Sequence, residues 1–132
     1  MVKGMTRELF YGTGESPGLA QCLSVYGDAA ININTAPKAV LRALSAEMTD
    51  DDVNLLDKYR RDRQNNLADA AWYQKVPRAT PIVIPLGLIK VKSEIFQITA
   101  VGLQGRMSER ITGVVKRGAG QQKATLLSWK VE

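Results

Sequence analysis

The segment between residues 31 and 37 constrains the fold of this chain more than any other part of the sequence. It reads Ile31, Asn32, Ile33, Asn34, Thr35, Ala36 and Pro37. The two isoleucines alternate with two asparagines, so the apolar side chains point to one side of an extended strand and the amides to the other. Thr35 suits a helix N-cap, and Pro37 suits a first helical turn, where a missing N–H costs nothing. The segment predicts an extended run leading into a helix, with Asn34 and Thr35 tying the loop rather than touching a partner.

Two helices are expected after this segment. Val40, Leu41 and Leu44 would lie on one apolar face of the first helix. Thr49 is a predicted N-cap for the second, and the aspartates at 50–52 would meet the positive end of its dipole. Three consecutive helical residues diverge around the axis and cannot converge on one ion. The aspartates therefore favour a dipole interaction over a metal site.

Alternating patterns dominate the C-terminal part of the chain. Strands are predicted over 95–101, 109–117 and 124–131, and the short connections between them are typical of antiparallel hairpins. Alternate residues of a one-sided sheet are buried. We therefore expect Phe96 and Ile98, with Ala100, to belong to the core.

The order of these patterns predicts an α+β chain, with helices first and strands later. A further helix is expected over 67–76, and prolines at 77, 81 and 85 then impose an extended connection. We expect the end of a first helical unit over 1–27, a helical domain over 28–85 and antiparallel strands over 86–132.

Composition argues against an enzyme. The chain has no histidine, which removes the usual general base near neutral pH and the commonest metal ligand. Its single cysteine, Cys22, cannot form an internal disulfide or a CxxC metal motif. No Gly-rich phosphate loop is present. We expect no catalytic residue, no metal or other cofactor and no small-molecule substrate.

One alternative is nucleic-acid binding. The sequence from Ile33 to Ala36, followed by an amphipathic helix and a basic second helix, resembles half of a helix-hairpin-helix module. In that interpretation the cationic residues of the second helix, Lys58, Arg60, Arg61 and Arg63, would contact phosphates. The hairpin at 44–49, however, has no glycine, and Glu47 and the aspartates put negative charge where a phosphate would sit. Such a run is more often a solvated helix face.

A second resemblance uses both halves of the chain. Four segments occur in order: Lys3 to Thr6, Leu23 to Pro37, Ser93 to Gly102 and Arg110 to Arg117. The strand positions that carry the resemblance are Ser93, Phe96, Ile98, Val114, Val115 and Arg117. Together these motifs resemble the K-type minor pseudopilins of the type II secretion system, also called general secretion pathway protein K.

This resemblance implies a structural protein rather than an enzyme. Family members carry a SAM-like, helix-hairpin-helix-like helical domain inserted into a pilin-like domain at the tip of a periplasmic pseudopilus. Their partners are other minor pseudopilins, and they act in protein transport across the outer membrane. A hydrophobic N-terminal helix anchors them in the bacterial inner membrane. We expect this chain to be a soluble C-terminal fragment without that helix, from the periplasmic part of the cell envelope, with a partial pilin-like domain. No carboxylate cluster supports carrying over the calcium site of some members.

Overall fold

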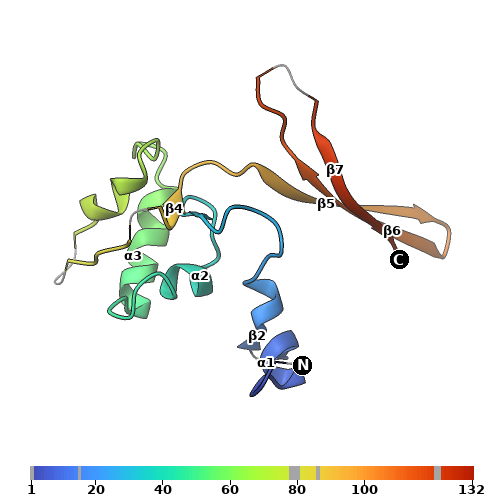
Figure 1. Ribbon diagram of the computed structural model, residues 1–132, viewed down its shortest axis with the longest axis horizontal. Coiled ribbons are helices and arrows are strands. Elements are labelled where there is room, and N and C mark those ends of the chain that lie inside the picture. Colours follow the sequence, from blue (N-terminus) through green and yellow to red (C-terminus); the bar gives the residue numbers. More distant parts are fainter. Residues whose placement is uncertain (1, 15, 78–80, 86, 121–122) are drawn as a thin grey trace. The chain divides into compact units, whose positions relative to one another are not determined.

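The computed structural model describes residues 2–14, 16–77, 81–85, 87–120 and 123–132 (Figure 1). The chain divides into two compact units, Met1–Val91 and Lys92–Glu132. The sequence placed a boundary after residue 85, whereas the first unit extends to Val91. The reason is a parallel pairing of β3 (Ile31–Asn32) with β4 (Ile89–Lys90), which keeps β4 with the helices. Part of the proline-rich connection, residues 78–80, lies outside the described residues.

The first unit is mainly helical. Its elements, besides β3 and β4, are α1 (Arg7–Tyr11), β1 (Gly12–Thr13), β2 (Ser16–Pro17), the 3-10 helix η1 (Leu19–Gln21), α2 (Lys38–Arg42), α3 (Asp50–Arg61) and the 3-10 helix η2 (Ala70–Lys75). The helix expected over 67–76 is the 3-10 helix η2, which is shorter and spans Ala70–Lys75. It begins late because Asp69 occupies the N-cap and its side chain accepts a hydrogen bond from the amide of Ala71 at 2.9 Å.

The start of α2 differs from the prediction. Pro37 is its N-cap, with no side-chain capping bond, so the expected cap by Thr35 was wrong. The backbone first makes a tight turn, in which the amides of Thr35 and Ala36 both donate to the carbonyl of Asn32. This turn delays the helix beyond the reach of the threonine hydroxyl.

The start of α3 confirms the prediction. Thr49 Oγ1 accepts a hydrogen bond from the amide of Asp52 at 3.2 Å, and Asp52 Oδ2 accepts one from the amide of Thr49 at 2.9 Å. This reciprocal arrangement is a capping box, which satisfies two amides that the helix itself cannot. The three aspartates lie in the first turn, and Lys58 lies in the last turn with two arginines. Both sets of charge complement the helix dipole.

We expect Thr49→Ala to lower the free energy of unfolding of the first unit by about 1 kcal/mol, because an amide at the start of α3 loses its acceptor. Urea denaturation followed by Trp72 fluorescence, in a Trp129→Phe background, measures the change. Thr49→Ser keeps the hydroxyl and is the matched control, with an expected loss well below that of the alanine variant. Equal stability of the alanine variant and the wild type would show that the cap contributes nothing.

Among the described residues, all buried apolar side chains belong to the first unit. Its buried apolar residues are Ile33, Ala36, Leu41, Leu44, Met48, Val53, Leu56, Trp72, Tyr73, Val76, Ile82 and Ile84. Leu41 and Leu44 confirm the apolar face predicted for the helix after Pro37, while Val40 packs at its edge. Among the described residues, no helix has the length and apolar content needed to cross a bilayer.

The second unit is a three-stranded antiparallel meander in the order β5-β6-β7. The strands are β5 (Ile95–Gln104), β6 (Met107–Lys116) and β7 (Thr125–Val131). All three predicted strands are present, and β5 is longer because its register with β6 continues to Gln104 opposite Met107. The two residues between them form the turn, where Gly105 has a φ of 61° that other residues rarely adopt. A bulge interrupts the pairing of β6 and β7 between Val114 and Val115.

The expected burial of this sheet was wrong. Phe96 is only partly buried, Ile98 is 56% exposed and Ala100 is exposed. None of the described residues from Lys92 to Glu132 reaches full burial. Three strands form a single layer, and a single layer buries side chains only when a second layer covers it.

Candidate functional site

Asn34 joins three separated parts of the first unit. Its Nδ2 donates to the carbonyl oxygens of Leu67 at 3.1 Å and Val91 at 3.3 Å. Its Oδ1 accepts a hydrogen bond from the indole nitrogen of Trp72 at 2.7 Å. The amide side chain thus uses both ends to hold the loop before η2 and the end of β4 against β3. Asn34 therefore ties the loop, as the sequence predicted.

A second polar cluster is built around Asp57 on α3. This carboxylate is only 6% exposed, and its Oδ1 accepts hydrogen bonds from Nε and Nη2 of Arg60 at 3.0 and 2.7 Å. Nη1 of Arg60 donates to the carbonyls of Ile33 at 3.1 Å and Ala36 at 2.8 Å. The guanidinium therefore connects α3 to the turn that precedes α2.

The charge of Asp57 is stabilised despite its burial. Burial raises the pKa of Asp57, but hydrogen bonds and charges from Arg60 and Arg61 outweigh that effect and leave the pKa below its ordinary value. Nε of Arg61 lies 3.0 Å from Oδ2, and Nζ of Lys38 lies 3.7 Å from the same oxygen. The carboxylate is thus surrounded by cations and is suited to be a structural anchor rather than a proton donor.

The basic residues of the nucleic-acid alternative do not form one surface set. Arg60 faces inward, with a side chain that is 10% exposed, whereas the side chain of Arg61 is 75% exposed. Lys58 and Arg63 are exposed. Three of the four cations are therefore at the surface, and the fourth, Arg60, makes hydrogen bonds inside the protein.

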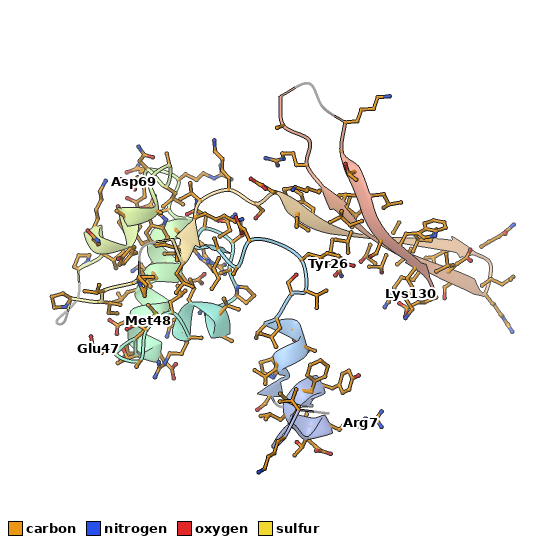
Figure 2. All side chains as sticks on the ribbon, viewed as in Figure 1. Arg7, Tyr26, Glu47, Met48, Asp69 and Lys130 are labelled. Carbon is orange, nitrogen blue, oxygen red and sulfur yellow. The ribbon has the colours of Figure 1, made fainter. Side chains whose placement is uncertain are left out.

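The hairpin between α2 and α3 has few free amides for a phosphate. The amide of Glu47 donates to Oγ of Ser45 at 3.3 Å, and that of Met48 donates to the carbonyl of Ser45 at 3.2 Å. The amide of Thr49 is held by Asp52. Glu47 is exposed at this hairpin, while Met48 is buried beside it (Figure 2). Hairpin geometry and charge therefore both disfavour an anion here.

Among the described residues, no group of three or more metal-ligating side chains lies close enough to hold an ion. The aspartates at 50–52 have other partners. Asp52 completes the capping box, and Oδ1 of Asp50 lies 3.6 Å from Nε of Arg42. Asp57 is the only buried charged residue of the described chain. Its partners are the cations of Arg60, Arg61 and Lys38, and through Arg60 it anchors α3 to the turn before α2.

The two faces of the second unit differ in chemistry. Residues directly opposite one another in an antiparallel sheet share a face. By this register, one face carries the side chains of Phe96, Ile98, Ala100, Ile111, Val115, Leu126, Trp129 and Val131. We call this set the apolar sheet face. The other face is more polar, with Gln97, Thr99, Ser108, Arg110, Thr112, Lys116, Thr125, Ser128 and Lys130, but it also carries Ile95, Val101, Leu103 and Val114. Figure 2 shows side chains standing out from both sides of these strands.

The centre of the apolar sheet face is a row of three residues in register. Gly113 on β6 lies between Ile98 on β5 and Trp129 on β7. Trp129 is 63% exposed and Leu126 is 59% exposed. The glycine has no side chain, and Cδ1 of Leu126 lies 3.7 Å from the position that a Cβ at Gly113 would take. Contiguous exposed apolar surface is typical of protein or membrane contact sites and of ligand-binding grooves.

The strand positions that carry the pseudopilin resemblance do not all lie on one face. Phe96, Ile98 and Val115 belong to the apolar sheet face, and Val114 belongs to the polar one. Ser93 precedes β5. Arg117 follows β6, and its guanidinium lies 4.9 Å from the ring centroid of Phe96, which is a cation–π contact. Leu126 and Trp129 of β7 also belong to the apolar sheet face. They are three positions apart, which regular alternation would place on opposite faces, and the bulge at Val114 and Val115 brings them to the same face.

No protein-family model, curated protein or solved structure matches this chain.

Proposed function

We propose that this chain is a non-enzymatic assembly component of the type II secretion pseudopilus tip, of the K-type minor pseudopilin class. It acts by protein–protein contact in the cell envelope, as the periplasmic part of a protein anchored in the inner membrane. The observation that carries the proposal is the apolar sheet face, which is extensive and exposed. The choice of the pseudopilus over other assemblies rests on the ordered sequence motifs that resemble this family.

The apolar sheet face supports a scaffold that is completed by another element. Burial of apolar surface contributes about 25 cal/mol per Å², so large exposed residues such as Trp129 and Leu126 gain stability when covered. In the proposed assembly a hydrophobic N-terminal helix covers this face. The completed domain then contacts other minor pseudopilins of the same system.

The first unit supports the proposal through its rigidity. The hydrogen bonds of Asn34 and Arg60 join its loops and helices. A unit of this kind is suited to a fixed shape that caps an assembly and blocks further subunits. The nucleic-acid alternative receives less support, because Arg60 faces inward and the hairpin amides are engaged.

The test is reconstitution. A form of the protein that carries the proposed N-terminal helix is mixed with the other minor pseudopilins and followed by sedimentation velocity. We expect a complex at tens of micromolar, and we expect Trp129→Lys to weaken it at least tenfold, since a charge would be placed in an apolar contact. Thr112→Lys introduces the same charge on the polar face and is the matched control, with association close to that of the wild type.

Two outcomes would count against the proposal. Absence of any complex with the complete set of partners would remove the assembly function. Equal weakening by Trp129→Lys and Thr112→Lys would show that covering the apolar sheet face does not contribute to assembly. A fluorescence anisotropy titration with labelled duplex DNA at low salt tests the alternative, in which affinity would fall steeply as salt is raised.

A further inference from the structure

A groove of about 410 Å³ runs beside the second half of α3 and is independent of the apolar sheet face. The helix forms one wall and the segment just after η2 forms the other. The lining residues that matter for the argument are Leu55, Lys58, Tyr59, Arg61, Val76 and Pro77. The groove lies wholly within the first unit.

The floor of this groove is apolar where α3 would ordinarily be polar. Val53 and Leu56 already fill the buried face of the helix, at 3% and 0% exposure. Leu55 points elsewhere and is 42% exposed. It shares one side of the helix with Tyr59, since residues four apart in a helix are neighbours. This exposed leucine is not needed by the core, and it offers an apolar contact to a partner.

The rim of the groove is cationic. Lys58 is exposed and forms no ion pair with any described residue. Nε of Arg61 forms an ion pair with Asp57, and the side chain of Arg61 is still 75% exposed. Asp62 is the acidic lining residue, and its Oδ1 already accepts a hydrogen bond from the amide of Gln64 at 3.0 Å. The rim therefore presents two cations to an incoming group and one partly engaged carboxylate.

We propose that this groove binds an acidic peptide segment of a partner protein, with an aliphatic or aromatic side chain on the Leu55 floor and carboxylates at Lys58 and Arg61. The proposal does not depend on the pseudopilus assignment. An open groove with an apolar floor and a charged rim has the anatomy of a peptide-contact surface. Opposite charges across such a contact set the specificity and the rate of association.

A nucleic acid fits the same groove less well. The ring of Tyr59 stacks on Trp72, with centroids 5.5 Å apart and an interplanar angle of 7°, so one of its faces is unavailable to a base. Arg60 is directed into the protein. Asp62 would oppose a phosphate backbone that passes along the rim. Peptide carboxylates can be placed singly, so they can contact Lys58 and Arg61 while avoiding Asp62.

The experiment uses a fluorescein-labelled peptide in which aspartate and glutamate flank a central Leu-Phe pair. Anisotropy at low salt should give a dissociation constant in the range of tens to hundreds of micromolar. We expect at least tenfold weaker binding by Lys58→Glu, which reverses a rim charge, and by Leu55→Ala, which removes the floor contact. Arg63→Glu is the matched control, because it makes the same charge change at an exposed position that does not line the groove, and it should alter affinity less than twofold.

Folding is checked by Trp72 fluorescence, and Leu55 is exposed enough that its alanine variant should remain folded. Three results would overturn the proposal. They are no binding by the wild type up to millimolar peptide, equal weakening by Arg63→Glu and Lys58→Glu, and equal affinity for a peptide with lysines in place of the acidic residues. Binding of a labelled oligonucleotide that is weakened by Lys58→Glu, with no binding of the acidic peptide, would assign the groove to nucleic acid instead.

Discussion

Asp57→Ala is expected to lower the free energy of unfolding of the first unit by about 3 to 5 kcal/mol, because it leaves a buried guanidinium without its counter-ion. Arg60 is 10% exposed and receives its charge balance from Asp57 at 2.7 Å. Its remaining hydrogen bonds, to the carbonyls of Ile33 and Ala36, cannot neutralise it. Urea denaturation followed by Trp72 fluorescence, in a Trp129→Phe background, reports this unit alone.

Two controls separate the buried charge from a general effect of losing an acidic residue. Asp51→Ala removes an exposed carboxylate from the same helix and should cost about 0.5 kcal/mol, mostly through the dipole. Asp57→Leu combined with Arg60→Met replaces both charges with apolar groups and should recover most of the lost stability. A double variant as unstable as Asp57→Ala would show that the hydrogen bonds, rather than the unpaired charge, dominate.

The same carboxylate makes stability depend on pH in one direction. The pKa of Asp57 is lower in the folded protein than in the unfolded chain, since Arg60 and Arg61 outweigh the effect of burial. The unfolded chain therefore takes up a proton first as the pH falls, at about 3.9 for an ordinary aspartate. The stabilisation is present above that pH and is lost as the pH falls through the folded pKa. Denaturation midpoints should fall more steeply below about pH 4 in the wild type than in Asp57→Asn. Parallel curves would contradict this assignment.

Asn34→Leu is expected to cost about 3 kcal/mol, since it keeps the size of the side chain but leaves polar groups without partners. The indole N–H of Trp72 loses its acceptor, and the carbonyls of Leu67 and Val91 lose their donor. Trp72 is fully buried, so water cannot replace the missing acceptor without a change in packing. Its fluorescence spectrum should shift together with the denaturation midpoint.

The control for Asn34 is a second asparagine with only a local role. Asn66 is exposed, and its Oδ1 accepts one hydrogen bond from the amide of Ala68 at 2.9 Å. Asn66→Leu should cost less than about 1 kcal/mol, because the freed amide can bind water. If the two variants were equally stable, the three contacts of Asn34 would have no energetic weight.

The sequence predicted features that depend on local pattern. Thr49 was found because a capping residue and an acidic first turn lie within four positions. The strands of the second unit were found because alternation and turns repeat over a long stretch. The burial of Ile98 was not predicted correctly, since alternation shows that a strand has two faces but not whether a second layer covers one of them.

Features that depend on distant contacts were not predictable in this way. Alternation at 31–34 predicted an extended run at β3, but β4 has only two residues, and no local pattern shows that it pairs with β3. This pairing keeps β4 in the first unit, which ends at Val91. Asn34 was expected to tie a loop, but its partner Val91 is 57 residues away. The Asp57–Arg60 pair was available in principle, since acidic and basic residues three apart in a helix are neighbours. Their burial, however, depends on the turn at Ile33, which only the structure shows.

The pairing of β3 with β4 also has a mechanical consequence. The chain enters the part of the first unit that holds α2, α3 and η2 at Ile31 and leaves it at Lys90, on two parallel strands. Hydrogen bonds from Ile31 N to Leu88 O at 2.8 Å and from Ile33 N to Lys90 O at 2.9 Å join the two strands. Tension applied to the two flanking segments pulls these strands lengthwise in opposite directions. The hydrogen bonds are then loaded together in shear instead of opening one after another. The β3–β4 pair therefore resists a pull along the chain before the force reaches the helices between these strands.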